Sequence, residues 1–289
     1  NGVRSGFTDI DSVTLGWQPS DLIIIAARPS MGKTAFVLTM ARNMAVDFKT
    51  PVAVFSLEMS SVQLMNRLIV AETQLSSKDL RTGNLTSQQW AHLETNTVEL
   101  GRSPLYIDDT PALSVYEFRS KARRLKTQHD IKLIIIDYLQ LMNASGMKFG
   151  SREQEVSTIS RNLKALAKEL NIPIIALSQL NRSTETREDK RPVLSDLRES
   201  GSIEQDADTV IFIYRDEYYM DAEAKDKIDV TKAPVAEIIV AKNRHGSTGT
   251  VKMHWIGRYT TFYSIEENRG DDAPPDYGAP PPAAPPAGM

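Results

Sequence analysis

The sequence has 289 residues, 41% of them hydrophobic, which is enough to fill the core of one large α/β domain with extensions. It contains no cysteine and only four scattered histidines, which excludes a disulfide framework and a thiolate zinc site and argues against a histidine metal cage. The net charge of −3 gives no basis for tight, nonspecific duplex binding, so we expect any nucleic-acid contact to be local or multiplied by oligomerisation.

The N-terminal stretch carries no targeting signal. "NGVRSGFTDID" is polar, and no apolar run in the chain approaches the roughly 20 residues that cross a bilayer. We therefore predict no membrane association, and a reducing, cytoplasmic setting is compatible with the composition. The chain begins without methionine and leads toward a strand, which suggests a fragment or a processed chain.

Short β-branched, apolar runs alternate with amphipathic helical segments along most of the chain. Strands that are apolar at successive positions are typical of a parallel sheet buried on both faces, so the fold class is α/β. The predicted strands are 22–27, 51–56, 104–108, 132–137, 173–178 and 209–214.

Helix starts are indicated where Thr86, Ser114 and Ser151 each precede Gln or Glu by three residues, the spacing of a capping box. After Ser151, apolar residues recur at helical spacing and predict one long helix with a buried face. These residues are Val156, Ile159, Leu163, Leu166 and Leu170.

The C-terminal part departs from this alternation. Beyond Ala233, "VAEIIVAKNRHGSTGTVKMHWI" predicts two strands joined by a glycine-containing turn, an antiparallel extension of the sheet. Residues 271–289 hold seven of the fifteen prolines and predict a disordered tail. We expect one domain over 1–268, a tail over 269–289, and a solvated acidic loop over 218–234.

Residues 27–34, "ARPSMGKT", match the phosphate-binding pattern G-x-x-x-x-G-K-[ST] except at the first position. A predicted strand precedes them and a helix follows, which is the context that such a loop requires. Backbone N–H groups at the helix start would face the β-phosphate, while Gly32 lets the backbone approach the phosphate without a Cβ. Lys33 would neutralise the β and γ oxygens, and the Thr34 hydroxyl would ligate Mg²⁺. The pattern predicts ATP and Mg²⁺ as cofactors, bound by Ala27, Arg28, Pro29, Ser30, Met31, Gly32, Lys33 and Thr34.

Three polar residues follow predicted strands and complete this site. Asp137 ends "KLIIID" and fits a metal-coordinating carboxylate, or simply the end of a strand. Glu58, after "PVAVFSL", fits a general base, or a charge favoured by a helix N-terminus. Gln179, after "PIIALS", fits a reader of the γ-phosphate, or a polar loop residue.

Five motifs in order, "ARPSMGKT", "SLEMS", "IIIDYLQLM", "SQLNR" and "DLRESGSIEQDAD", resemble the RecA-like motor domain of bacterial DnaB-type replicative helicases over about residues 3 to 265. Loops of that family often carry alanine where Ala27 stands. The resemblance implies a RecA-like P-loop NTPase that forms a homo-hexameric ring, hydrolyses ATP, moves 5′ to 3′ on single-stranded DNA and unwinds duplex at the replication fork. It also implies a bacterial, nucleoid-associated enzyme with primase and a helicase loader as partners.

The resemblance assigns roles residue by residue. It supports Glu58 as base, Asp137 as metal ligand and Gln179 as γ-phosphate sensor. In "DLRESG" the family positions that touch DNA phosphates are Arg198, Glu199 and Gly201, although read alone this stretch fits an acidic solvated loop. In "VAKNRHG" the family pair reaches into the neighbouring subunit, with Arg244 as arginine finger and Lys242 as its helper, although read alone it fits a surface pair.

Family members also carry an N-terminal domain and a linker helix that packs on the adjacent subunit. Neither precedes Asn1, so we expect assembly and primase binding to depend on a portion outside this sequence. Two alternatives stay open: a RecA-like recombinase, which forms a filament for strand exchange, and a P-loop ATPase scaffold that assembles with nucleotide but does not translocate.

Overall fold

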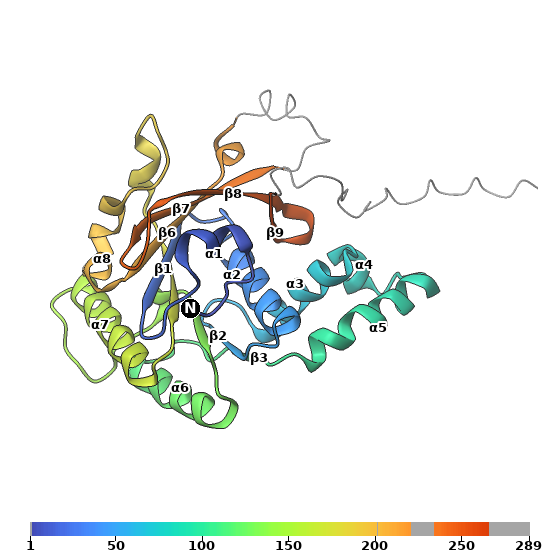
Figure 1. The fold of residues 1–289 in the computed structure, drawn as a ribbon, viewed down its shortest axis with the longest axis horizontal. Coiled ribbons are helices and arrows are strands. Elements are labelled where there is room, and N and C mark those ends of the chain that lie inside the picture. Colours follow the sequence, from blue (N-terminus) through green and yellow to red (C-terminus); the bar gives the residue numbers. More distant parts are fainter. Residues whose placement is uncertain (1, 201, 221–233, 266–289) are drawn as a thin grey trace, which may run out of the picture.

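One mixed sheet organises the chain (Figure 1). The computed structural model describes residues 2–200, 202–220 and 234–265, with only the backbone described for 198–200. The nine strands lie in the order β3-β2-β4-β5-β1-β6-β7-β8-β9. The pairs from β3 to β6 are parallel and those from β6 to β9 are antiparallel. The strands are β1 (Leu22–Ala27), β2 (Val52–Ser56), β3 (Leu105–Asp108), β4 (Leu133–Asp137), β5 (Ile174–Gln179), β6 (Thr209–Tyr214), β7 (Val235–Asn243), β8 (Gly249–Ile256) and β9 (Thr261–Ser264).

All six predicted strands form, which confirms the α/β class with a mainly parallel sheet. Four begin one residue later than predicted, and three of these begin directly after Pro51, Pro104 and Pro173. Proline has no N–H to donate to a neighbouring strand, so it stands before the ladder rather than within it. The edge strand β3 is half-buried, whereas β1, β2, β4 and β6 are buried at every position.

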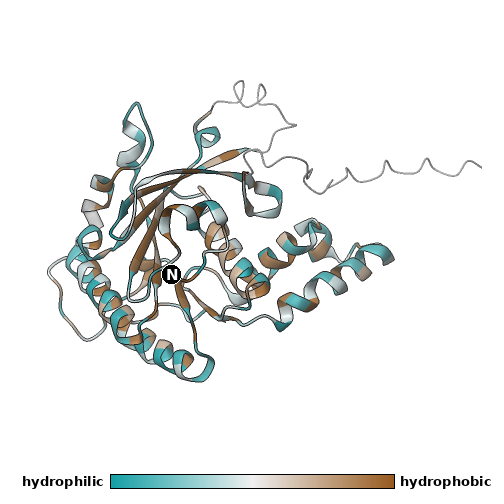
Figure 2. Ribbon diagram, viewed as in Figure 1, coloured by the Kyte–Doolittle hydropathy of each residue, from teal (hydrophilic) through white to brown (hydrophobic). Residues whose placement is uncertain are grey.

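Helices cover both faces of the parallel sheet. α1, α2, α3 and α5 pack with one set of strand side chains, and α6, α7 and α8 pack with the alternate set. Figure 1 shows α6 and α7 on the side of the sheet away from α2, and Figure 2 shows apolar strands between helices with polar outer surfaces. The helices are α1 (Thr8–Thr14), α2 (Lys33–Arg42), α3 (Ser61–Thr73), α4 (Ser77–Thr82), α5 (Ser87–Arg102), α6 (Val115–His129), α7 (Arg152–Leu170) and α8 (Ile203–Asp206).

The predicted helix starts are correct, although only one carries a complete capping box. Thr86 and Gln89 bond reciprocally at the start of α5. Ser114 and Ser151 accept hydrogen bonds at the starts of α6 and α7, but the reciprocal bond of a capping box is made at neither position. In α7 the Gln154 side chain accepts instead from the N–H of Gly150. The predicted apolar face of α7 is buried, apart from the partly exposed Leu170 near its end.

The antiparallel extension has one strand more than the sequence predicts. β7 and β8 match the two predicted strands, and β9 follows after a short turn at Gly257–Tyr259. β9 is only four residues long, too short for a periodic signal, and its Phe262 is buried against Phe36 of α2 and Trp255 of β8. The predicted tail over 269–289 and most of the predicted loop over 218–234 lie outside the described residues. In the described part of the chain, no helix is long and apolar enough to cross a membrane.

Candidate nucleotide site

The predicted phosphate loop lies at the carboxyl edge of the parallel strands, where it joins β1 to α2. In the sheet register Ala27 pairs with Gln179, and Ser56 pairs with Asp137. Because these strands are parallel, the ends of β1, β2, β4 and β5 meet at one edge. The loop, Glu58, Asp137 and Gln179 therefore come from four adjacent strands.

The loop backbone takes left-handed conformations at Ser30, with φ of 65°, and at Gly32, with φ of 96°. A Cβ at Gly32 would also lie 3.1 Å from the ring of Phe262. The positive φ favours glycine at Gly32, and an added Cβ would also crowd the Phe262 ring. Ala27 is fully buried in β1, where a methyl side chain is accommodated.

Two arginines fix the outer part of the loop. Arg28 donates to the carbonyl of Leu180 at 2.7 Å and to Glu185 at 2.9 Å. Arg215 donates to the carbonyl of Ser30 at 3.1 Å, and its guanidinium lies 4.8 Å from the ring centre of Trp255. These hydrogen bonds tie the loop to the segments that follow β5 and β6.

Thr34, in the first turn of α2, contacts the end of β4. Its hydroxyl donates a 2.7 Å hydrogen bond to Oδ2 of Asp137. The other oxygen, Oδ1, is buried and accepts no hydrogen bond from any residue that the structure describes. Burial raises the pKa of Asp137, against the opposing effects of the Thr34 bond and the Lys33 charge. A buried carboxylate oxygen without a partner beside a hydroxyl fits an oxygen-preferring cation such as Mg²⁺.

The described ranges contain no group of three or more His, Cys, Asp or Glu side chains that could hold a metal on its own. A cation held by Thr34 and Asp137 would take its further oxygen ligands from a nucleotide or from water.

Lys33 is largely withdrawn from water. Burial lowers its pKa, and the charges of Asp137 and Glu58 oppose this effect. Its ammonium group lies 5.2 Å from the ring centre of Tyr138. A desolvated lysine close to two carboxylates is well placed to hold an anion when one binds.

Glu58 lies on a tight turn just beyond β2. The Ser56 hydroxyl closes this turn by donating to the carbonyl of Met59 at 2.7 Å and accepting from its N–H at 3.2 Å. The Leu57 N–H donates to the carbonyl of Asp137 at 2.7 Å, which keeps the turn beside β4. Glu58 is exposed and is therefore presented to solvent near Lys33 and Asp137.

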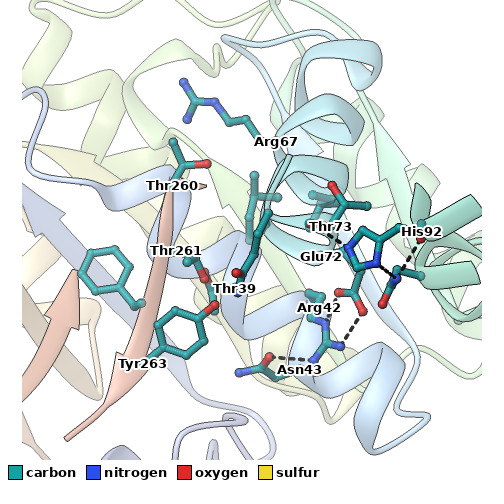
Figure 3. Close-up of a pocket in the computed structure, with 16 residues that line it drawn as sticks. Thr39, Arg42, Asn43, Arg67, Glu72, Thr73, His92, Thr260, Thr261 and Tyr263 are labelled. Atoms are coloured by element: carbon teal, nitrogen blue, oxygen red, sulfur yellow. Dashed lines mark hydrogen bonds and ion pairs between the residues drawn. The ribbon is translucent and has the colours of Figure 1, made fainter. Parts of the chain in front are cut away.

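Helices α2 and α3 are joined by a partly buried ion pair. Arg42 of α2 donates to both oxygens of Glu72 of α3, at 2.7 and 2.8 Å (Figure 3). Arg42 also pairs with Asp47. A cavity of about 400 Å³ lies between α2, α3, α5 and β9, along the C-terminal half of α2. The pair fixes the helix that follows the loop against the helix that follows Glu58.

Lys242 and Arg244 lie at the opposite edge of the sheet. β7 runs antiparallel to β6, so its end returns to the edge where β1 and β6 begin. Arg244 pairs with the buried Asp208 at 2.8 Å, and Lys242 donates to the carbonyl of Glu204 at 2.7 Å. Burial, aided by the charge of Arg244, lowers the pKa of Lys242. Neither cation is brought to the phosphate loop of its own chain.

The predicted DNA-contacting residues are only partly described. Arg198 and Glu199 lie in a 3₁₀ segment, η4 (Leu194–Ser200), that follows β5, but their side chains are outside the described structure. Gly201 lies outside the described residues. The segment is anchored by Asp196, which accepts two hydrogen bonds from Arg187 and one from the N–H of Val193.

Sequence reasoning missed three residues of the site: Arg67, Gln140 and Arg215. Burial dominates the pKa of Asp137, but Arg67 of α3 lies near enough for its charge to lower it. Gln140 hydrogen-bonds to the backbone of Gln179. Arg215 directly follows β6. Glu58 and Gln179 were identified because they follow predicted strands, and the same signal could have identified Arg215.

Comparisons with known proteins agree on one family. The model of the DnaB-like helicase C-terminal domain matches residues 2–264. A replicative DNA helicase, DnaC of Bacillus subtilis, is 51% identical over 280 residues, covering 97% of this chain and 59% of the relative. The chain thus spans less than two thirds of the length of this curated relative.

Solved structures of an ATPase domain and of a DnaB-like replicative helicase are also similar to this chain. One solved ATPase domain has a TM-score of 0.84 at 42% identity, with 92% of each chain covered. A DnaB-like replicative helicase studied with primase has a TM-score of 0.83 at 42% identity, covering 92% of this chain and 62% of the other. The RadB recombinase matches with a TM-score of 0.53 at 15% identity, over 91% of this chain and all of that chain, which shows the fold alone.

These matches confirm the RecA-like fold, and they favour a helicase over a recombinase because the similarity in sequence is to helicases. The chain belongs to the DnaB-like helicase C-terminal domain family.

Proposed function

We propose that this chain is the ATP-hydrolysing motor of a replicative DNA helicase. The observation that carries the proposal is the contact between the Thr34 hydroxyl and Asp137, whose second, buried oxygen has no partner among the described residues. This arrangement fits Mg²⁺-ATP, with residues 27–34 around the phosphates and Thr34 and Asp137 as the protein's magnesium ligands. When bound, Mg²⁺ supplies charge neutralisation at the phosphate oxygens.

The residues of this chain then have distinct tasks. Lys33 holds the β- and γ-phosphate oxygens by charge and hydrogen bonding. Glu58, exposed and close to Lys33, accepts a proton from the attacking water and orients it. Gln179, at the end of the central strand β5, reads the γ-phosphate through its side-chain amide.

We further propose that Lys242 and Arg244 act on the site of a neighbouring subunit. In the sheet register they lie level with the first residues of β1, while the phosphate loop follows its C-terminal end, and a six-residue strand spans about 20 Å. A cation so far from its own nucleotide contributes to hydrolysis only across an interface. A closed homo-hexamer satisfies this requirement at every site.

The motor is proposed to translocate 5′ to 3′ on single-stranded DNA. Arg198, Glu199 and Gly201 would contact the phosphates without reading bases, and repetition around a ring would compensate for the acidic net charge. The solved relative studied with primase, together with the family, supports primase as a partner, and we extend the proposal to a helicase loader and to a bacterial cytoplasmic setting near the nucleoid.

A scaffold ATPase that does not translocate is the competing function. Steady-state ATP hydrolysis, measured against protein concentration with and without single-stranded DNA, separates the two. A motor with shared sites gives a rate per subunit that rises with concentration and again with DNA. A rate that rises with concentration but ignores DNA would favour the scaffold.

A further inference from the structure

The side-chain amide of Gln140 brackets the backbone of Gln179, the proposed γ-phosphate sensor. Its Nε2 donates to the Gln179 carbonyl at 3.2 Å, and its Oε1 accepts from the Gln179 N–H at 3.3 Å. Nε2 also donates to the hydroxyl of the fully buried Ser178 at 2.8 Å. The β4–β5 ladder ends at Ile136 and Ala176, so Gln140 replaces strand pairing where the two strands part.

The first turn of α7 holds the main chain of Gln140 in turn. The Arg152 guanidinium donates to the carbonyl of Gln140 and, at 2.8 Å, to the carbonyl of Met142. Arg152 also pairs with Glu155, which accepts from the N–H of Ala144 at 3.0 Å. Three backbone groups between residues 140 and 144 are thus fastened to one helical turn.

Helix α7 continues this connection to the segment proposed to contact DNA. The Ser157 hydroxyl accepts from the N–H of Ser202 at 3.1 Å, just beyond η4. Ser160 of α7 hydrogen-bonds to Asp206 of α8. Leu197 of η4 is buried in the same apolar cluster as Val156 of α7. A displacement of the first turns of α7 therefore changes the packing of Leu197 and the hydrogen bond to Ser202, on either side of the segment.

We propose that Gln140 is a positioning residue that couples Gln179 to α7 and, through α7, to the DNA-contacting segment. This inference rests on the proposed function, because it assumes that Gln179 responds to the γ-phosphate and that residues 198–201 respond to DNA. Its physical basis is a short series of hydrogen bonds in which each residue is held by the next. The hydrogen bonds of the Gln140 side chain reach Ser178 and Gln179 but neither the phosphate loop nor η4. Gln140 therefore acts on the coupling between Gln179 and the DNA-contacting segment.

The test compares the ratio of DNA-stimulated to basal ATP hydrolysis in the intact protein. Gln140→Ala removes the amide, and Gln140→Glu keeps its size but cannot donate to the Gln179 carbonyl. We expect both to lower the ratio by about 3- to 30-fold, the usual range for a residue that transmits coupling. Gln154→Ala is the matched control, because Gln154 orders the same loop through the N–H of Gly150 without contacting Gln179.

The outcomes are distinct. The inference is supported if both Gln140 variants lose stimulation while Gln154→Ala and the melting temperatures stay near wild type. It is overturned if wild type is stimulated and the variants are stimulated equally, or if basal and stimulated rates fall together at an unchanged ratio. If wild type itself shows no stimulation, the proposed function fails and the inference fails with it.

Discussion

Arg244 pairs with the buried carboxylate of Asp208 at 2.8 Å, and the Arg244 N–H donates to the Asp208 carbonyl at 2.9 Å. Asp208 also accepts from the N–H of Leu22 and from Lys164. The proposed arginine finger is therefore anchored to the first residue of β1, the strand whose other end enters the phosphate loop.

Arg244→Ala should preserve nucleotide binding, because Arg244 is remote from its own phosphate loop. Lys164 still pairs with Asp208, so the fold should persist. Assembly-dependent turnover should fall by a factor of about 10³ to 10⁵, the contribution of an arginine finger. The measurement is ATP hydrolysis beside nucleotide binding, with Arg258→Ala, an exposed arginine stacked on Tyr259, as the control.

Mixed assemblies of two variants test whether Arg244 acts on the neighbouring subunit. Arg244→Ala subunits carry an intact Glu58, and Glu58→Gln subunits carry an intact Arg244, so a mixed assembly should recover part of the lost turnover. Failure of the mixture to exceed either variant alone, under conditions where both assemble, would argue against action in trans.

Glu58→Gln should keep nucleotide affinity and lower turnover by about 10²- to 10⁴-fold, because the amide cannot accept the proton of the attacking water. Glu99→Gln is the control, since Glu99 is exposed and pairs with Lys49 at the surface. Single-turnover hydrolysis is the measurement, and full turnover by Glu58→Gln would transfer the base role to another residue.

Lys33→Ala should weaken nucleotide binding by about 10- to 150-fold, the loss expected for hydrogen bonds to a charged group. Calorimetric titration with ATP and Mg²⁺ measures it, with the exposed Lys49→Ala as the control. Unchanged affinity would remove the phosphate-loop assignment.

Gly32→Ala tests the shape of the loop. A side chain at φ of 96° costs about 1–2 kcal/mol, and the added methyl would crowd the ring of Phe262. Gly83→Ala is a matched control, because Gly83 also has a positive φ, of 68°, but an added Cβ there meets nothing within 4 Å. Gly32→Ala should lower the melting temperature more than the control and alone reduce ATP affinity; equal effects would contradict the crowding at Phe262.

Asp196→Asn tests the anchor of η4. Burial raises the pKa of Asp196, but hydrogen bonds from Arg187 and Val193 outweigh it and hold the pKa below 3.8. Since the folded pKa is below the unfolded one, the anchor stabilises the fold at pH above about 4, and this contribution is lost as the pH falls through the folded pKa.

At pH 7 the substitution should therefore speed hydrogen exchange over residues 187–200. The free energy of local opening of this segment should fall by about 2 kcal/mol. The difference in exchange rate between Asp196→Asn and wild type should vanish at a pH below the pKa of Asp196 in the folded protein. Asp189→Asn, at an exposed position beside Arg191, should leave the exchange unchanged, and a wild-type exchange rate in Asp196→Asn would show that the anchor contributes nothing.

Local patterns sufficed for much of the fold and of the candidate site. Buried runs such as "LIIIAA" form strands because their side chains are apolar at successive positions. The loop at 27–34 is recognisable because its glycine, lysine and threonine occupy consecutive positions that one backbone conformation requires. The short strand β9 was missed because four residues contain too little periodicity, and its formation depends on Phe262 packing against distant Phe36.

Which segments form strands and which residues can bind phosphate can be read from the amino-acid sequence, because both depend on neighbours along the chain. Which strand ends meet depends on the packing of the whole chain. The order of strands placed Asp137 within 2.7 Å of Thr34 and returned Arg244 to the opposite edge beside Asp208. It also set the amide of Gln140 against Gln179. These contacts join residues dozens of positions apart, and their energies arise from packing and register across the sheet, which no local spacing encodes.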